Sequence, residues 1–368
     1  MNVNCVYLLK LYTSAIKESA PPEIGDDADF ALLFLLAKAH EIAGTVYYAL
    51  EKLNIIDDSA LDKKWRDKRS QLFHRALIQK QELLRAGVLF DENGIDYMPV
   101  KGFFVSSFYP QEDFRTMSDI DVLVSRDNLK KAGELLTQLG YKAKLEGIIH
   151  HDVYNKPPFL SIELHHELVG INSEFYDYYS DLTGRYYPED GHRHRLRDED
   201  AYIFCMVHAY KHFAKCGFGI RTVSDFYFLN KKLLPKLDAE YINNELKKLK
   251  ISSFVREISD IAEKWFDRQD FDSFSKTEKY ILESGVYGTK AHKIENISKE
   301  IGYSGFILKR VFPPLREMQA FFPRLRKYPI LLPFYYVFRI FRQLSSKRRG
   351  NTRKELHTLH KIKEKNKD

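Results

Sequence analysis

Residues 118–125, SDIDVLVS, join two acids to a short run of aliphatic residues, a pattern that predicts a β-strand. Side chains two apart on a strand share a face, so Asp119 and Asp121 emerge together while Ile120 and Val122 point into a core. Two neighbouring carboxylates repel each other, and proteins commonly neutralise such a pair by binding a hard divalent cation. The stretch therefore predicts bound Mg²⁺, with Mn²⁺ as the alternative ion. A solvated strand face is the competing interpretation.

A lysine and a glycine stand upstream of these acids, between an expected strand, IDYMPV, and an expected helix, FFVSSFY. Gly102 lets backbone N–H groups approach a phosphate closely, and a following helix favours negative charge. Lys101 and Arg115 are further candidates for phosphate contacts. Structural alternatives remain for all three: the glycine can serve only the turn, the lysine can lie along the surface, and the arginine can form a cap or salt bridge.

A third acid is expected on a neighbouring strand, and SIELHHEL supplies one. Ile162 and Leu164 alternate inward, so Glu163 and His165 share the opposite face. Glu163 is predicted to be a third metal ligand or a general base, which must reach the proton of the attacking hydroxyl. A structural role for His165 is at least as well supported, and His166 is expected to face the other way.

The rest of the chain is mostly helical in pattern. Residues 29–53 place apolar side chains three and four apart without a proline, which predicts one helix, and a second helix is expected from Leu61 to Phe90. Strands and helices then alternate, and helical periodicity returns from Arg197. The predicted class is α+β, a small mixed sheet with flanking helices, in four regions: an N-terminal helical region at 1–90, a core at 91–190, a helical domain at 191–308, and a proline-interrupted basic segment at 309–368.

The charge distribution is uneven. From Lys309 to Asp368 there are 17 Lys and Arg against 4 Asp and Glu, whereas the preceding residues carry 41 against 47. Such a tail can meet RNA, anionic lipid or an acidic partner, although a solvated helix with a frayed end is the simpler interpretation. Three scattered cysteines, no signal-like start and no apolar stretch of ~18 residues predict a cytoplasmic protein, with peripheral membrane contact left open.

Together these residues resemble a known group. Lys101-Gly102, Tyr109-Pro110, the spacing from Arg115 to the two acids, and Glu163-Leu-His165 are similar to the uncharacterised nucleotidyltransferase family of the polymerase-β-like superfamily. The likeness extends over most of the chain, because it includes LLAKAHEIAGTVYYAL, VHAYKHF, RTVSDF, FPPLREM and YPILLPF. The wider superfamily usually has Gly-Ser or Gly-Gly closer to the acids, so Lys-Gly and the longer spacing suggest a family-specific version of the phosphate loop.

The resemblance implies a polymerase-β-like core, a divalent metal, and transfer of a nucleoside monophosphate from an NTP, such as ATP, with release of pyrophosphate. The acceptor is not implied and can be a small molecule, a protein or RNA. Because the later helical layer is expected to flank the nucleotide, Lys211, His212 and Arg221 are predicted to contact the triphosphate. The pair His208 and His212 lacks the glutamate of HExxH, so helix packing is favoured over zinc. The alternative function is a non-catalytic scaffold that docks on RNA or membrane through the basic tail.

Overall fold

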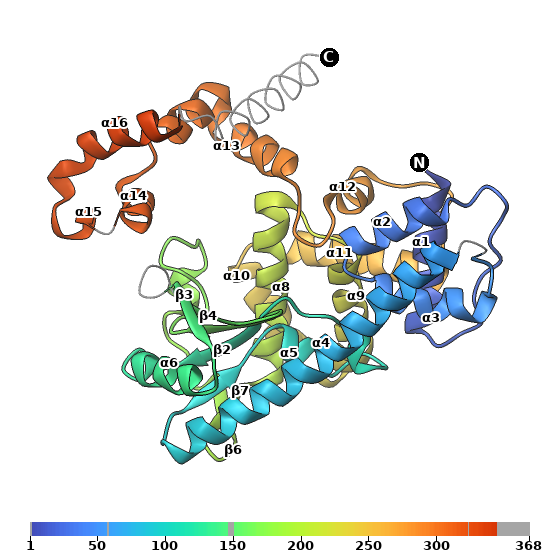
Figure 1. The fold of residues 1–368 in the computed structure, drawn as a ribbon, viewed down its shortest axis with the longest axis horizontal. Coiled ribbons are helices and arrows are strands. Elements are labelled where there is room, and N and C mark those ends of the chain that lie inside the picture. The colour runs from blue at the N-terminus through green and yellow to red at the C-terminus, as the bar shows by residue number, and fades with distance from the viewer. Residues whose placement is uncertain (1, 57–58, 146–150, 323, 344–368) are drawn as a thin grey trace. The chain divides into compact units, whose positions relative to one another are not determined.

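A computed structural model describes residues 2–56, 59–145, 151–322 and 324–343. The chain divides into two compact units: the first comprises Met1–Tyr210 and Gly219–Val286, and the second comprises Lys211–Phe218 and Tyr287–Asp368. The β-sheet (Figure 1) belongs to the first unit, as do Asp119, Asp121 and Glu163. The four-region division made from the sequence stays a prediction.

Helices dominate the part of the chain that the structure describes, and the strands found there all lie between Tyr97 and Leu196. The α-helices are α1 (Val3–Ile16), α2 (Phe30–Ala39), α3 (Ala43–Leu53), α4 (Ser59–Glu92), α5 (Gly102–Ser106), α6 (Leu129–Gln138), α7 (Tyr176–Tyr179), α8 (Asp198–Cys216), α9 (Ile220–Phe228), α10 (Ala239–Lys248), α11 (Ser252–Glu263), α12 (Lys276–Ser284), α13 (Lys290–Val311), α14 (Leu315–Phe321), α15 (Arg324–Lys327) and α16 (Leu332–Gln343). Short 3₁₀ or π segments are η1 (Glu112–Phe114), η2 (Leu229–Leu233), η3 (Leu234–Lys236), η4 (Lys264–Arg268) and η5 (Pro329–Leu331). The strands are β1 (Tyr97–Pro99), β2 (Ile120–Val124), β3 (Lys142–Leu145), β4 (His151–Lys156), β5 (Leu160–His165), β6 (Tyr186–Asp190) and β7 (Arg193–Leu196).

The strands form one mixed sheet in the order β3-β4-β5-β2-β1-β7-β6. β2 runs parallel to β5 and antiparallel to β1, and β1 runs parallel to β7. The predicted α+β class is confirmed. The strands predicted from the sequence correspond to β1, β2 and β5, whereas β3, β4, β6 and β7 were not predicted. β6 is exposed along its whole length, so it carries no apolar alternation from which a strand could be predicted.

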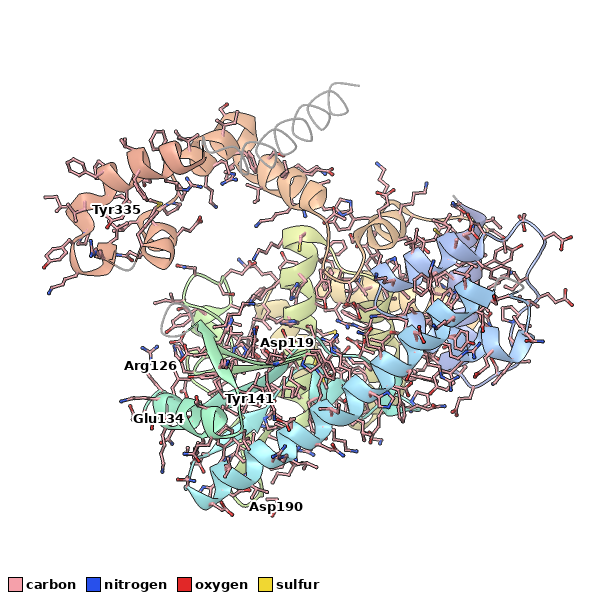
Figure 2. The ribbon with its side chains drawn as sticks, in the orientation of Figure 1. Asp119, Arg126, Glu134, Tyr141, Asp190 and Tyr335 are labelled. Carbon is pink, nitrogen blue, oxygen red and sulfur yellow. The ribbon has the colours of Figure 1, made fainter. Side chains whose placement is uncertain are left out.

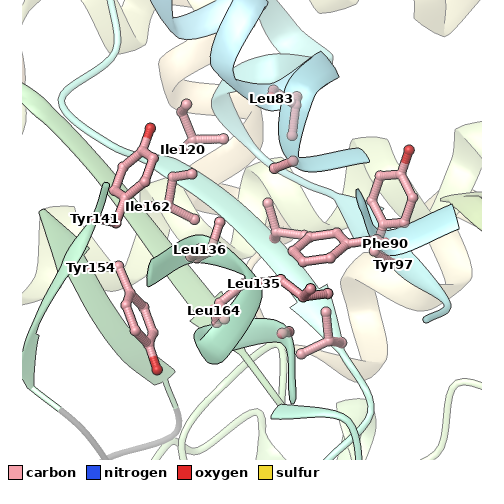
Figure 3. Close-up of a cluster of buried hydrophobic side chains, with 14 of the residues drawn as sticks. Leu83, Phe90, Tyr97, Ile120, Leu135, Leu136, Tyr141, Tyr154, Ile162 and Leu164 are labelled. Carbon is pink, nitrogen blue, oxygen red and sulfur yellow. The ribbon is translucent and has the colours of Figure 1, made fainter. Parts of the chain in front are cut away.

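One face of the sheet is covered by α4 and α6, as Figures 1 and 3 show. Ile120 and Val122 of β2 are buried there, as predicted, and β5 adds Ile162 and Leu164. The helices contribute Leu83, Ala86, Phe90, Ala132, Leu135 and Leu136. Each fully buried aliphatic or aromatic side chain stabilises the fold by ~1.5–3 kcal/mol. This core fixes which face of β2 and β5 remains for polar residues.

The single helix expected over residues 29–53 is wrong: the structure has two helices with a break at His40–Ile42. Glu41 adopts a left-handed φ of 55°, and the Ile42 N–H donates back to the Ala37 carbonyl, a typical helix C-terminus. The buried ring of His40 accepts from the Ile220 N–H and donates to the Leu282 carbonyl. These partners are distant in sequence, so apolar periodicity could not predict the break.

The helix expected from Leu61 to Phe90 is confirmed as α4, which ends just before Asn93 and Gly94. Gly94 has a φ of 65°, a conformation that glycine adopts without a Cβ penalty.

The second unit contains α13 to α16, and α13 is interrupted at Gly302. Within it, Tyr336 of α16 donates to the Pro313 carbonyl, and Arg339 donates to the Arg310 carbonyl. Residues 344–368, the last part of the predicted basic tail, lie outside the described residues. Among the helices that the structure describes, none has the length and apolar character needed to cross a membrane.

Candidate active site

Three acidic side chains converge on the sheet face opposite the core. The parallel pairing of β2 with β5 places Asp121 beside Glu163, just as it places Ile120 beside Ile162 in the core. Asp119, labelled in Figure 2, immediately precedes β2. Burial raises the pKa of Asp119, and the negative charges of Asp121 and Glu163 raise it further. The predicted carboxylate set is therefore brought together in space.

Lys101 is the immediate counter-ion of this cluster. Its Nζ lies 2.6 Å from Asp121 Oδ1. Burial alone would raise the pKa of Asp121, but the charges and hydrogen bonds of Lys101 and His165 hold it well below its usual range. Lys101 also has φ 55° and ψ −111°, a conformation rare for residues with a side chain. Such backbone strain costs roughly 1–3 kcal/mol and is found most often at functional sites.

Two histidines complete the acidic face. His165 Nε2 donates to Asp121 Oδ1 at 2.7 Å and lies 3.5 Å from Glu163 Oε2. His151 of β4 pairs directly with His165 across the antiparallel ladder, and its Nε2 is 3.4 Å from the same glutamate oxygen. His165 was predicted to share the face of Glu163, whereas His151 was not identified from the sequence. Recognising β4 as the strand paired with β5 is the signal that would have found it.

Two side chains closely approach the position of Gly102. A Cβ at this position would lie 2.7 Å from Arg115 Nη1 and 2.9 Å from Met117 Sδ, both inside ordinary contact distance. The Nε and Nη2 of Arg115 donate to Asp225 at 3.2 and 2.9 Å, which leaves Nη1 as the edge nearest Gly102. Arg115 thus forms a salt bridge, which was one of the two roles considered for it. Its contact with a phosphate stays a prediction.

Helix α9 fixes the loop that enters β2. Arg221 donates through Nη1 to the Thr116 carbonyl at 2.8 Å, so this predicted phosphate ligand is engaged with the backbone of the loop. Tyr109 donates to Asp225 at 2.7 Å, and its oxygen also lies 2.8 Å from Ser224 Oγ. The loop is therefore anchored by side chains about a hundred residues away in sequence.

Helix α8 contributes Cys205 near the same charges. Burial is the main cause that raises the pKa of this thiol to about 12, with Asp225 adding to the shift and Arg115 opposing it. Lys211 and His212 occur later in α8 and belong to the second compact unit. Their predicted contacts with the triphosphate stay predictions.

Comparison with known proteins adds the family. A family model described as "Uncharacterised nucleotidyltransferase" matches residues 26–267, a range that includes the entire carboxylate cluster. The chain belongs to this nucleotidyltransferase family. It is therefore a transferase that uses an NTP, as the resemblance implied, and the α+β nucleotidyltransferase fold is confirmed. No curated protein and no solved structure matches the chain.

Proposed function

We propose that this nucleotidyltransferase is magnesium-dependent and transfers a nucleoside monophosphate to an acceptor hydroxyl, with release of pyrophosphate. ATP is the first donor to test. The observation that supports this proposal is the convergence of Asp119, Asp121 and Glu163 on one sheet face, beside the cationic Lys101 and Arg115.

The donor set fits Mg²⁺. Carboxylate oxygens are the ligands that hard cations prefer, and three carboxylates converge here beside one ammonium, that of Lys101. After burial, the negative charges of Asp121 and Glu163 are the next causes of the raised pKa of Asp119. Bound Mg²⁺ would neutralise the carboxylates and would stabilise negative charge on the phosphates of the donor. Asp119 and Asp121 are the proposed ligands, and Glu163 is the proposed third carboxylate.

The other residues have roles that follow from their positions. Lys101 can exchange its bond with Asp121 for a phosphate oxygen, and Arg115 Nη1 can donate to a second phosphate oxygen beside Gly102. Burial would raise the pKa of Glu163, but the hydrogen bond from His165 and the influence of His151 lower it, so the carboxylate is ionised at neutral pH. Glu163 can therefore accept the proton of the acceptor hydroxyl. As it does so, the hydroxyl oxygen of the acceptor bonds to the α-phosphorus of the NTP, and the bond between that phosphorus and the pyrophosphate oxygen breaks.

Incubation with α-labelled NTPs, Mg²⁺ and cell extract tests this function. We expect label to move onto one acceptor class with stoichiometric pyrophosphate release, and both signals to vanish in Asp119→Asn and Asp121→Asn. Asp96→Asn is the matched control, because Asp96 is an exposed acid that pairs only with His192 among the ion pairs of the described residues. Equal labelling by the wild type and by both site variants would refute the proposal.

The second unit favours an additional role in membrane docking. Ile330 is 85% exposed and Phe334 is 73% exposed, and the exposed cations Arg324 and Lys327 lie in the same segment. Exposed apolar side chains beside cations are typical of segments that lie on anionic lipid. We expect co-sedimentation with phosphatidylglycerol vesicles but not with phosphatidylcholine vesicles, lost on Phe334→Ser. Binding to RNA with no vesicle binding would refute this role and favour the RNA alternative.

A further inference from the structure

His151, Glu163 and His165 form a second donor cluster on the same sheet face. One ligand atom from each residue lies within 4.8 Å of the other two. The glutamate Oε2 is 3.4 Å from His151 Nε2 and 3.5 Å from His165 Nε2. All three side chains project from the paired strands β4 and β5, so the sheet holds their backbones at fixed spacing.

These distances match the coordination geometry of zinc. Zn²⁺ binds histidine nitrogen and carboxylate oxygen at about 2.0–2.2 Å, almost always in a tetrahedron. The edge of a tetrahedron is about 1.6 times the distance from its centre to a corner, so ligand atoms should be roughly 3.4 Å apart. The two edges from Glu163 Oε2 to the imidazole nitrogens already have this length, so binding of an ion requires chiefly that the two imidazoles approach each other.

The donor types separate this cluster from the magnesium site. Mg²⁺ prefers oxygen ligands, whereas imidazole nitrogen suits Zn²⁺ and other transition metals. We propose that His151, Glu163 and His165 form a transition-metal site that takes Zn²⁺ and adjoins the carboxylate pair Asp119 and Asp121.

Burial and charge suit entry and retention of such an ion. The His165 side chain is 2% exposed, whereas those of His151 and Glu163 are 15% and 21% exposed. An ion and a solvent ligand can therefore enter from the side of His151, while the buried His165 closes the opposite side of the site. The Glu163 carboxylate oxygen, 3.4 Å and 3.5 Å from the two imidazole nitrogens, supplies a negative charge that favours a cation at this position.

His165 must change its hydrogen bonding when it binds metal. Its Nε2 donates to Asp121 in the present geometry and cannot also offer a lone pair to an ion. The loaded ring therefore carries its proton on Nδ1, and Asp121 retains Lys101 as its partner. The site thus draws on the same network that stabilises the catalytic carboxylates.

The consequence for transfer rests on the proposed function. Glu163 is shared by the two sites, and zinc bound to its Oε2 removes the base that accepts the acceptor's proton. We expect Zn²⁺ to inhibit the magnesium-dependent reaction, and the ratio of activity with and without Zn²⁺ to move toward one in His151→Gln.

Binding is measured separately from transfer. Protein stripped with EDTA is titrated with Co²⁺, whose visible absorption reports tetrahedral coordination, and then with Zn²⁺ against a chromogenic chelator. We expect one ion per chain, with affinity at least about tenfold lower in His151→Ala and His151→Gln. His192→Ala is the control, because its exposed ring pairs with Asp96 and is not part of the cluster. Asp119→Asn should retain zinc while losing transfer.

Absence of tetrahedral Co²⁺ absorption in the folded wild-type protein would overturn the proposal. Equal zinc affinity in the wild type and in both His151 variants would do the same, since the ion would then be bound elsewhere. Neither result depends on an acceptor or an NTP. A failed metal titration with intact transfer would therefore remove the zinc site and leave the proposed function standing.

Discussion

Replacing Asp225 with Asn tests the buried ion pair between Arg115 and Asp225. The carboxylate accepts two hydrogen bonds from Arg115 and one from Tyr109. The Arg115 and Asp225 side chains are 12% and 14% exposed, so solvent cannot replace the lost charge. Removing one partner of such a buried pair leaves an uncompensated charge and typically costs about 3–5 kcal/mol. We expect a loss of this size in the free energy of unfolding of the first unit.

Urea denaturation followed by tryptophan fluorescence suits this measurement. Trp65 and Trp265 are both buried in the first unit, and the chain has only these two tryptophans, so the signal reports that unit alone. A double variant, Arg115→Met with Asp225→Leu, provides the matched comparison. Because a hydrophobic pair can replace a buried ion pair at little cost, we expect the double variant to recover most of the stability lost by either single change.

The same variants separate stability from function. If Arg115 Nη1 contacts phosphate beside Gly102, the stable double variant should still show a KM for NTP at least about tenfold higher, equivalent to about 1.4 kcal/mol. A loss of less than about 1 kcal/mol in Asp225→Asn would contradict a buried, charge-balanced pair. Normal KM in the double variant would show that the pair is structural only.

Three further changes have defined outcomes. The pKa of His40 is lowered by burial from 6.5 to about 4, so its contribution to stability is complete above pH 6.5 and is lost as the pH falls toward 4. We expect a decline of about 2 kcal/mol between pH 6.5 and 5 in urea denaturation, and a smaller one in His40→Gln. In Gly102→Ala the new methyl displaces Arg115, which should raise the KM for NTP by roughly tenfold in steady-state assays while changing stability by only ~1–3 kcal/mol. In Lys101→Met the cluster becomes more negative, so Mg²⁺ should bind roughly tenfold more tightly by calorimetry while kcat falls.

The sequence predicted the carboxylate face because strand alternation is a local property. Ile120 and Val122 had to point into the core, which left Asp119 and Asp121 on the other side, and the same logic placed Glu163. The adjacency of β2 and β5 was an inference from chemistry, since a metal site needs a further ligand. The register that pairs Asp121 with Glu163 agrees with it.

What the sequence did not reveal depends on contacts between distant segments. Arg115 and Asp225 are 110 positions apart, and no spacing rule relates them. His151 entered the cluster only because β4 pairs with β5, and β4 has too little apolar alternation to be recognised alone. The break after α2 likewise depends on hydrogen bonds of His40 with residues some two hundred positions away.

Lys101 connects the fold to the chemistry more directly than any other residue. A glycine at position 101 would adopt the φ of 55° at a lower energetic cost than lysine does. Because a lysine occupies this position, we infer that the interactions of its ammonium group offset the backbone strain. The ammonium balances Asp121, which otherwise would be a buried charge beside two further acids. A divalent ion held by the carboxylates would supply that balance, and the ammonium could then bind an incoming phosphate. The same side chain can thus stabilise the metal-free fold and bind the donor.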